Sequence, residues 1–413
     1  MSGYLWIFIT LICMFLMRWY ICWVPPDSKG RYPVPGRWYR LKRLLYLGLM
    51  HWSPKKATSY WGLCKTQSQC KGKEYAGLRS PRDLENVQAL ADHPHAIDSV
   101  YFTAFTEEGT SFIITRIARR PGNQCEVWLF MRLDRVGDFQ HPAHPTTILR
   151  ADSDMCWSGG GLTVECKEPY ATWAISFNGL LRKGPFRHHD SEDDGETVHV
   201  KFTLLWTAIT DVFDFDWDLN PGIVADALAL EKMSSEFLKV IKKSNEEHCR
   251  YEQWGSYAAE LTIDGHEEIA MCMKGIRSHS YGIRDWAKFH RYVMFLMHFE
   301  NGTFVHLNIV SLPNSTNHLI VGYVIQNGYK VGIDWSNAHL FHIADDRIIN
   351  DNYQISFTAG GKSYEVSATL DSRSSPLVYN GNPSVGDTHE CIATFTLGLD
   401  CRGWGLVEFY YRN

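Results

Sequence analysis

The sequence predicts a mainly β protein, in which two tandem antiparallel β-barrels are joined by one helix and preceded by an N-terminal transmembrane helix. The 413 residues suffice for two domains and an extension. From about residue 97 the chain consists of short β-branched or aromatic runs separated by hairpin turn residues. One helical pattern divides these runs into two blocks of comparable size. We therefore predict five segments: an anchor at 1–26, a basic segment at 27–96, a first β domain at 97–219, a linker helix at 220–250 and a second β domain at 251–413.

The first element is an almost unbroken apolar run at 4–24, which Arg18 interrupts and Pro25-Pro26 ends. At 1.5 Å per residue, such a run is about long enough to cross the hydrocarbon core of a bilayer. A cleaved signal peptide is the alternative, but the run has no basic segment before it and no small-residue cleavage site after it. The pattern favours a single-pass anchor in the endoplasmic reticulum membrane.

Basic residues are concentrated directly after this run. Residues 1–73 carry 12 Lys and Arg but one acidic residue, whereas the rest of the chain has a net charge of -16. Because basic residues flank the cytoplasmic side of a span, the body is expected in the cytoplasm, although sequons at Asn301 and Asn314 count against this topology. An acidic body also argues against nucleic acid as a partner, so we expect a membrane partner instead.

The second element is a helix at 37–52. Arginines lie on one face of this helix. On the other face, apolar residues recur at helical spacing: Trp38, Leu41, Leu45, Leu49 and Trp52. This pattern suits a helix lying in the headgroup layer of an anionic leaflet. Packing of the helix on the body is the alternative.

The body is expected to contain strands on both sides of a helix at 224–248. The helical spacing is carried by Leu230, Met233, Phe237, Val240 and Ile241, after a Pro-Gly start at 221–222. The clearest strands before it are 99–106, 111–120, 125–133, 161–166, 172–182 and 198–209. Those after it include 257–263, 267–275, 291–299, 303–311 and 318–326, with Asn-Gly turns at 301–302 and 327–328.

The sequence lacks the motifs that are typical of several kinds of enzyme chemistry. The chain lacks a glycine-rich phosphate loop, a GxSxG elbow, a CxxC pair and any zinc-ligand spacing. The acidic run at 188–196 is more typical of a solvated loop than of a metal site. We therefore expect no cofactor and no metal.

The densest polar run is GIRSHSYGIRDW at 275–286, and the chain closes with CRGWGLVEFYYR at 401–412. With the strands at 157–182, these motifs resemble the hydroxyneurosporene synthase-like family of tandem lipocalin-like (calycin) proteins, which includes carotenoid hydratases and Diels–Alderase-like cyclases. The similarity looks closest to animal and bacterial members, covers about 97–413, and departs from the usual pattern at Ser278 and Tyr281.

The resemblance implies two lipocalin-like barrels beside an apolar pocket that binds an isoprenoid or polyketide-type lipid. It implies cofactor-independent chemistry in which an acid, kept protonated by apolar walls, transfers its proton to an alkene. The candidate catalytic residues are Glu408, Asp285 and His279. The candidate ligand-binding residues are Tyr281, Trp286, Trp404, Arg277 and Arg284.

A structural role for the same residues stays open, because arginine–carboxylate pairs also close barrel corners. The enzyme hypothesis is a cyclase, hydratase or isomerase acting on an apolar lipid. The alternatives are a non-catalytic lipid binder or carrier, and an interaction module that assists another enzyme. An acid without an arginine partner in an apolar site would favour catalysis. The oligomeric state has no sequence signal.

Overall fold

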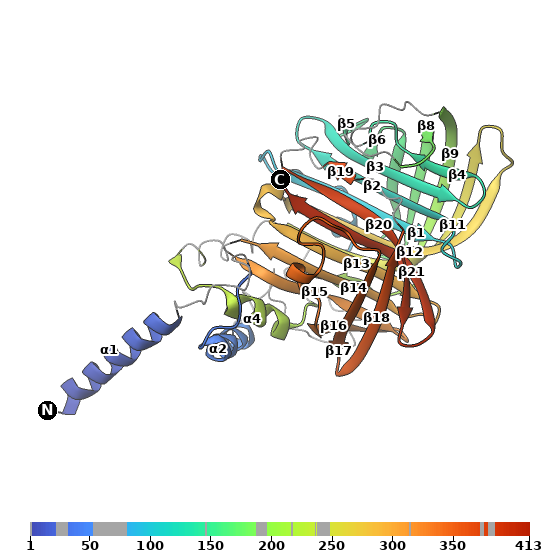
Figure 1. Cartoon of the computed structure of the whole chain (residues 1–413). Coiled ribbons are helices and arrows are strands. Elements are labelled where there is room, and N and C mark those ends of the chain that lie inside the picture. Colours follow the sequence, from blue (N-terminus) through green and yellow to red (C-terminus); the bar gives the residue numbers. More distant parts are fainter. Residues whose placement is uncertain are drawn as a thin grey trace.

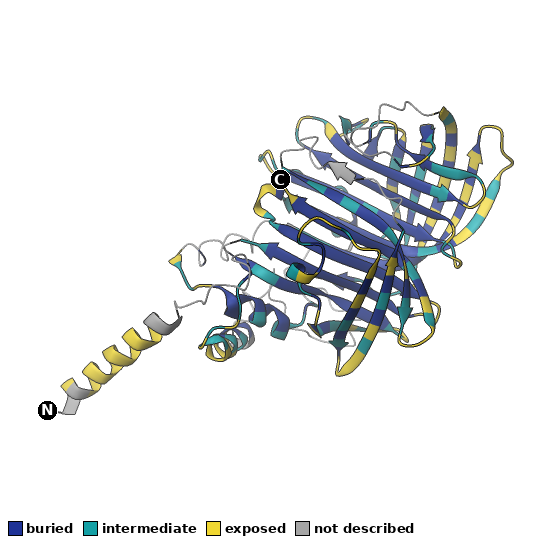
Figure 2. Cartoon of the chain, in the orientation of Figure 1, coloured by how far each residue is buried: buried dark blue, intermediate teal, exposed yellow. Residues whose placement is uncertain are grey.

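The computed structural model describes residues 2–21, 32–52, 81–144, 147–186, 196–215, 218–235, 237, 248–313, 315–371, 376–378 and 385–413 (Figure 1). Most of these residues belong to two antiparallel β-barrels that lie against each other (Figure 1). Buried residues run along the strands of both barrels, whereas the helix at the N-terminus is exposed (Figure 2). The predicted mainly β architecture is confirmed.

The first barrel is a closed ring of eight strands. In ring order they are β1 (Ala96–Phe105), β2 (Phe112–Arg120), β3 (Gln124–Leu133), β4 (Gly137–Gln140), β8 (Thr172–Lys183), β9 (Glu196–Ala208), β11 (His248–Ile263) and β12 (Ile269–Ile283), which pairs with β1. Four short strands attach to this ring: β5 (Ile148–Arg150), β6 (Trp157–Gly159), β7 (Leu162–Glu168) and β10 (Phe213–Asp214). Its interior is filled by apolar side chains such as Phe102, Leu129, Trp173 and Phe202.

The second barrel is also a closed ring of eight strands. They are β13 (Arg291–Phe299), β14 (Phe304–Leu312), β15 (Thr316–Gln326), β16 (Tyr329–Ser336), β17 (Asn352–Ala359), β18 (Lys362–Leu370), β20 (Gly386–Leu397) and β21 (Cys401–Arg412). Pairing of β18 with β20 closes the ring, and β19 (Pro376–Val378) extends β20. Two short 3-10 helices flank it, η2 (Trp286–Lys288) and η3 (Leu340–His342). The Asn327-Gly328 turn has both residues at positive φ, as a two-residue hairpin requires.

The hairpin of β11 and β12 follows the linker helix, yet it is hydrogen-bonded into the first barrel. β11 pairs with β9, and β12 pairs with β1, so this hairpin closes the ring. The predicted domain boundary at residue 250 assigns almost all of this hairpin to the second β domain. The strand pairing assigns the hairpin to the first barrel instead. The reason is that β9 and β1 would otherwise be edge strands with unpaired backbone groups.

Helix α4 (Pro221–Leu230) covers the first part of the predicted linker helix. It begins at an N-cap, where the Asn220 side chain accepts a hydrogen bond from Gly222 N at 2.7 Å. It ends at Glu231, whose backbone is extended. Of the predicted helical stripe, Val240 and Ile241 lie outside the described residues.

The prediction of a membrane anchor is wrong. The first helix, α1 (Ser2–Ile21), has Arg18 in its last turn. No helix among the described residues has the length and apolar character needed to cross a membrane. Residues 22–31, with Pro25-Pro26, lie outside the described residues, as do most of the acidic run at 188–196 and Asn314.

The second helix, α2 (Tyr39–Trp52), packs on α4, as the alternative expectation has it. Its buried face contains Lys42, Tyr46 and Met50, whereas the leucines of the predicted stripe are exposed: Leu41, Leu45 and Leu49. Polar contacts fix this orientation, because Lys42 Nζ donates to the Glu231 carbonyl at 2.7 Å and Tyr39 donates to Asp226 at 2.6 Å. The helix therefore packs on the body through a face other than the predicted apolar stripe.

Candidate functional site

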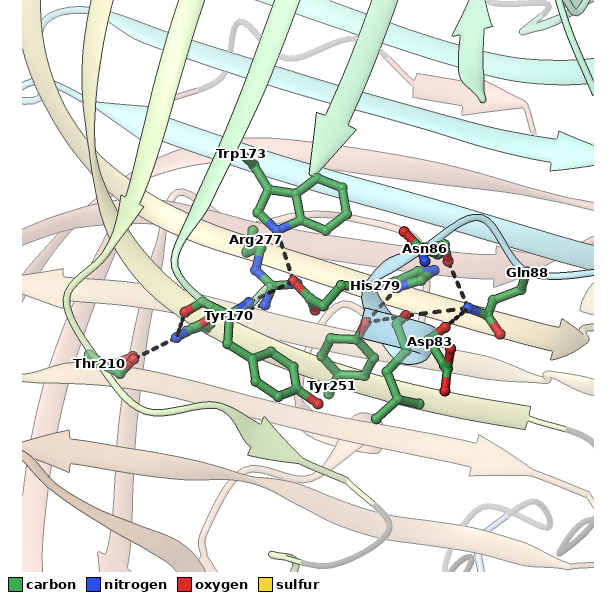
Figure 3. A network of polar contacts seen from close by, with 12 residues as sticks. Asp83, Asn86, Gln88, Tyr170, Trp173, Thr210, Tyr251, Arg277 and His279 are labelled. Atoms are coloured by element: carbon green, nitrogen blue, oxygen red, sulfur yellow. Dashed lines mark hydrogen bonds and ion pairs between the residues drawn. The ribbon is translucent and has the colours of Figure 1, made fainter. Parts of the chain in front are cut away.

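The predicted motif at 275–286 divides between the inside of the first barrel and the turn that leaves it. Arg277, His279 and Tyr281 alternate along β12 with residues that face outward, and α3 (Pro81–Glu85) covers the end of the barrel where they lie (Figure 3). We call the polar groups at this end the mouth network.

Arg277 is the fully buried cation of the mouth network. Its Nη1 lies 2.8 Å from Glu85 Oε1, and its Nη2 donates to Gln253 Oε1 at 2.8 Å. The rings of Trp173, Trp206 and Tyr251 lie 5.2–5.4 Å from the guanidinium carbon. Glu85 Oε2 also accepts from Trp173 Nε1 at 2.9 Å, so the carboxylate is paired on both oxygens (Figure 3).

His279 lies beside this pair and contacts a second buried carboxylate. Its Nε2 is 2.7 Å from Asp98 Oδ1, and its Nδ1 is 2.6 Å from the Tyr251 hydroxyl. The other oxygen of Asp98 accepts from Arg119 Nη1 at 3.0 Å and from the backbone N–H of Gln88 at 2.9 Å. Each carboxylate of the mouth network thus has an arginine partner, which is the arrangement expected of a structural element.

The remaining motif residues lie after β12. Asp285 caps η2 by accepting from Ala287 N at 3.0 Å, and its Oδ1 is 3.8 Å from His95 Nε2. The Arg284 guanidinium lies 5.3 Å from the ring of Trp286, and Trp286 packs against Tyr410. Arg277 pairs with Glu85 rather than with Asp285, and the structure does not bring Asp285 to Glu408 or His279 as one catalytic group.

Glu408 lies in a different place, on the outer face of the second barrel where it meets the first. We call this contact the seam. Glu408 on β21 is directly opposite Glu390 on β20, so both carboxylates project from the same face of the sheet. Tyr292 of β13 donates to Glu408, and Tyr101 of the first barrel donates to Glu390 Oε1 at 2.9 Å. Glu390 and Glu408 are 4% and 5% exposed.

The facing carboxyl groups affect the pKa of Glu390. Burial and the nearby Glu408 carboxylate raise the pKa of Glu390 well above its usual value, and Tyr101 and Arg116 only partly oppose this. Glu390 Oε2 has no hydrogen-bond donor among the described residues. The surroundings of Glu390 thus favour its protonated, neutral form.

Two other glutamates of the seam are ionised. Burial alone would raise the pKa of Glu126, but Arg120 and Arg116 contact it at 2.9 Å and lower it. Burial acts in the same direction on Glu252, but Arg250 and His306 hold its pKa at about 2. Environments that separate the pKa values of neighbouring acids are typical of acid–base sites.

Trp404 marks the far end of the seam. It lies four positions before Glu408 on β21 and packs over Gly109 in the turn between β1 and β2. A Cβ atom on Gly109 would lie 1.8 Å from Trp404 Cδ1, so only glycine fits beneath the indole. Apolar residues such as Leu296 and Leu406 lie on the same face between Trp404 and Glu408.

The sequence interpretation missed Glu390. Its signal is the hairpin pairing of 386–397 with 401–412, which places Glu390 opposite Glu408 once the turn at 398–400 is recognised. A surface hollow with a volume of about 520 Å³ has neither carboxylate in its lining, which consists of Gly122, Asn123, Gln124, Ile148, Leu149 and Arg150. Within the described ranges, no three His, Cys, Asp or Glu residues are arranged to hold a metal ion.

Known proteins of similar structure include kievitone hydratase from Nectria haematococca, with 12% identity over 77% of this chain and 89% of that chain and a TM-score of 0.47. They also include an AttH protein from Nitrosomonas europaea, with 13% identity over 82% and 97% and a TM-score of 0.47. CghA has 10% identity over 77% and 88% and a TM-score of 0.45.

One of these proteins is a hydratase, a class of enzyme named in the predicted resemblance. A special closeness to animal or bacterial members is not shown. No curated protein sequence matches the chain significantly. One family model matches residues 7–411 and thus includes the N-terminal part that the predicted resemblance leaves out. The chain belongs to this family, described as a family of unknown function (DUF8627).

Proposed function

We propose that this protein is a cofactor-independent acid catalyst that acts on an apolar isoprenoid or polyketide-type polyene at the seam. The observation that carries the proposal is the Glu390–Glu408 pair, in which burial and like charge keep one carboxyl group protonated at neutral pH. A neutral carboxylic acid in apolar surroundings is a general acid that needs no metal or nucleotide.

The proposed reaction begins with transfer of the Glu390 proton to one carbon of an alkene. The neighbouring carbon becomes a cation, and the new carboxylate is stabilised by the Arg116 charge and by the Tyr101 hydroxyl. The cation then takes water and loses a proton, loses a proton from an adjacent carbon, or is attacked by a second alkene to give a new cation that loses a proton in turn. In each case a proton returns to the carboxylate pair, and the products are those of hydration, cyclisation or isomerisation.

Aromatic side chains beside the pair suit such a cation. Tyr292 and Tyr410 stack with ring centroids 5.3 Å apart, and Trp286 lies 5.4 Å from Tyr410. The faces of these rings are negative and attract a cation. Because Glu390 and Glu408 are buried, the proposal requires the two barrels to separate along the seam when substrate enters.

The test is incorporation of solvent deuterium into carbon. The full-length protein is incubated in D₂O with farnesol or squalene, and with the lipids that co-purify with it, and products are analysed by mass spectrometry. We expect carbon-bound deuterium in at least one lipid, and loss of it in the Glu390→Gln variant. Glu165→Gln, at an exposed position of β7, is the matched control and should retain activity.

Two outcomes would reject the proposal. The first is incorporation that Glu390→Gln leaves unchanged. The second is a lipid that co-purifies with both the wild type and Glu390→Gln but gains no deuterium, which would support a non-catalytic binder or carrier. The interaction-module alternative predicts that neither protein retains any lipid.

A further inference from the structure

His298 on β13 is a buried polar side chain of the seam that the proposed chemistry does not use. It is 3% exposed, and neither ring nitrogen has a hydrogen-bond partner among the described residues. It lies on the same face as Trp404, its direct partner on β21. His298 is thus placed at the end of the seam opposite the Glu390–Glu408 pair.

Aromatic rings from both barrels surround His298. Its ring centroid lies 6.1 Å from Phe105, 6.4 Å from Trp254 and 5.8 Å from Trp404. Phe304 of β14 is its direct partner on the other side. Outside these rings, Lys274 and Glu107 form an ion pair at 3.1 Å that is largely exposed, so the cluster lies close to the rim of the seam.

The protonation state of His298 is fixed by this environment. Burial lowers its pKa to about 4, the Lys274 charge acts in the same direction, and the Glu107 charge opposes it. At neutral pH the ring is neutral and has one N–H donor and one acceptor nitrogen. Burying either group without a partner is unfavourable, whereas a phenylalanine would bear no such cost. A histidine here therefore needs a reason other than stability.

We propose that His298 anchors a binding site for a planar, apolar ring that carries a hydroxyl group. A hydroxyl both donates and accepts, so it can satisfy either imidazole nitrogen, and the flanking Phe105, Trp254 and Trp404 rings suit an aromatic or unsaturated ring. We also identify this ring as one end of the substrate on which Glu390 acts. That part of the inference rests on the proposed function.

The spacing of the two sites defines the substrate further. Trp404 and Glu408 are four residues apart on β21, which corresponds to about 14 Å at 3.4 Å per residue. Leu296 and Leu406 lie between them and offer only apolar contacts. The substrate class is therefore an elongated molecule with a hydroxylated ring at His298, an apolar chain along the seam and its reacting double bond at Glu390.

The experiment compares 2-naphthol with 2-methylnaphthalene, which has a similar shape but no hydroxyl. Binding to the full-length protein is measured by calorimetry and tryptophan fluorescence. We expect 2-naphthol to bind about tenfold more tightly to the wild type, since one hydrogen bond contributes on the order of 1 kcal/mol. His298→Phe should bind the two probes equally and should melt about 2–4 °C higher. His266→Phe, at an exposed position, should match the wild type.

Retained preference for 2-naphthol in His298→Phe, or a lower melting temperature, would overturn the inference. Trp404→Leu is an independent test, because loss of the indole should weaken the binding of both probes to the same extent. Unchanged binding of both probes would also count against the site. Glu390→Gln separates the two proposals. If it abolishes deuterium incorporation but keeps the preference for 2-naphthol, both proposals hold. Deuterium incorporation with no preference for 2-naphthol in the wild type rejects this inference alone.

Discussion

The mouth network and the seam both bury acidic side chains, yet these acids have different partners. At the mouth, Glu85 and Asp98 each contact an arginine, Arg277 and Arg119. At the seam, Glu390 faces another carboxylate, and its hydrogen-bond donor is the hydroxyl of Tyr101. An arginine in contact favours the ionised form of a buried acid, whereas a second acid raises its pKa and favours the protonated form.

Position on the seam does not by itself produce this difference. Glu126 is also on the seam and is fully buried, but Arg116 and Arg120 lower its pKa. The seam therefore contains ionised and protonated glutamates side by side. This comparison yields four predictions, from the largest expected effect to the smallest.

Replacing Arg277 of the mouth network should cause the largest change in unfolding free energy. In Arg277→Leu the Glu85 carboxylate stays buried without its arginine, so unfolding free energy should fall by about 3–5 kcal/mol. Urea denaturation measures this, with Lys167→Leu as control, since the exposed Lys167–Glu165 pair should contribute less than about 1 kcal/mol. Equal small losses in both variants would show that the mouth network is not a structural element.

The ionised acid Glu252 should make the protein sensitive to acid. Its pKa is about 2 in the folded state and about 4.3 in an unfolded chain. Because the folded pKa is the lower one, its contribution is complete above about pH 5 and is lost as the pH falls towards 2, by roughly 3 kcal/mol. Urea denaturation at several pH values should show a shallower acid loss in Glu252→Gln, and an identical slope would contradict the assignment.

The stability contribution of Glu390 should depend on pH in the direction opposite to that of Glu252. Its folded pKa is raised, so its contribution is complete below the unfolded pKa of about 4.3 and is lost as the pH rises above it. Glu390→Gln should therefore increase stability at pH 7 by on the order of 1 kcal/mol and flatten the curve above pH 5. Glu126→Gln is the matched control on the same seam and should destabilise. A loss in both variants would mean that Glu390 is ionised.

Asp285→Asn should have the smallest effect. The side chain caps η2 through Ala287 N and contacts His95 at 3.8 Å, and asparagine is an equally good cap. The change in unfolding free energy should stay within about 0.5 kcal/mol. A loss of several degrees in a thermal melt would show that Asp285 has a buried cationic partner, as the sequence interpretation suggested.

The sequence predicted local structure better than it predicted pairing. Turn residues such as Asn327-Gly328 mark hairpins because they act over four residues, and the helix at α2 follows from spacing alone. The orientation of α2 could not be found in this way, because Lys42 and Tyr39 fix it through distant partners on α4. A stripe of apolar residues does not reveal such contacts.

The candidate site was predicted in part. Glu408 was identified from its motif, but its role depends on Glu390, which has no motif of its own. His279 and Arg277 carried the stronger signal because they stand in a dense polar run. The structure pairs both with acids from outside that run, Asp98 and Glu85, and pairing at such separations cannot be derived from residue spacing.

The strand order also governs how the chain can fold as it is synthesised. Asp98 and His279 are 181 positions apart, so the first barrel cannot close before β12 has left the ribosome. In between, α4 is made, but its partner β15 of the second barrel, where Asn317 N donates to Glu231 at 2.6 Å, is synthesised only after β12. High contact order slows folding, and until closure β1 and β9 expose edges that can pair with other chains. A nascent chain that stops at residue 219 is therefore expected to depend on chaperones, whereas one released after residue 283 can complete its first barrel.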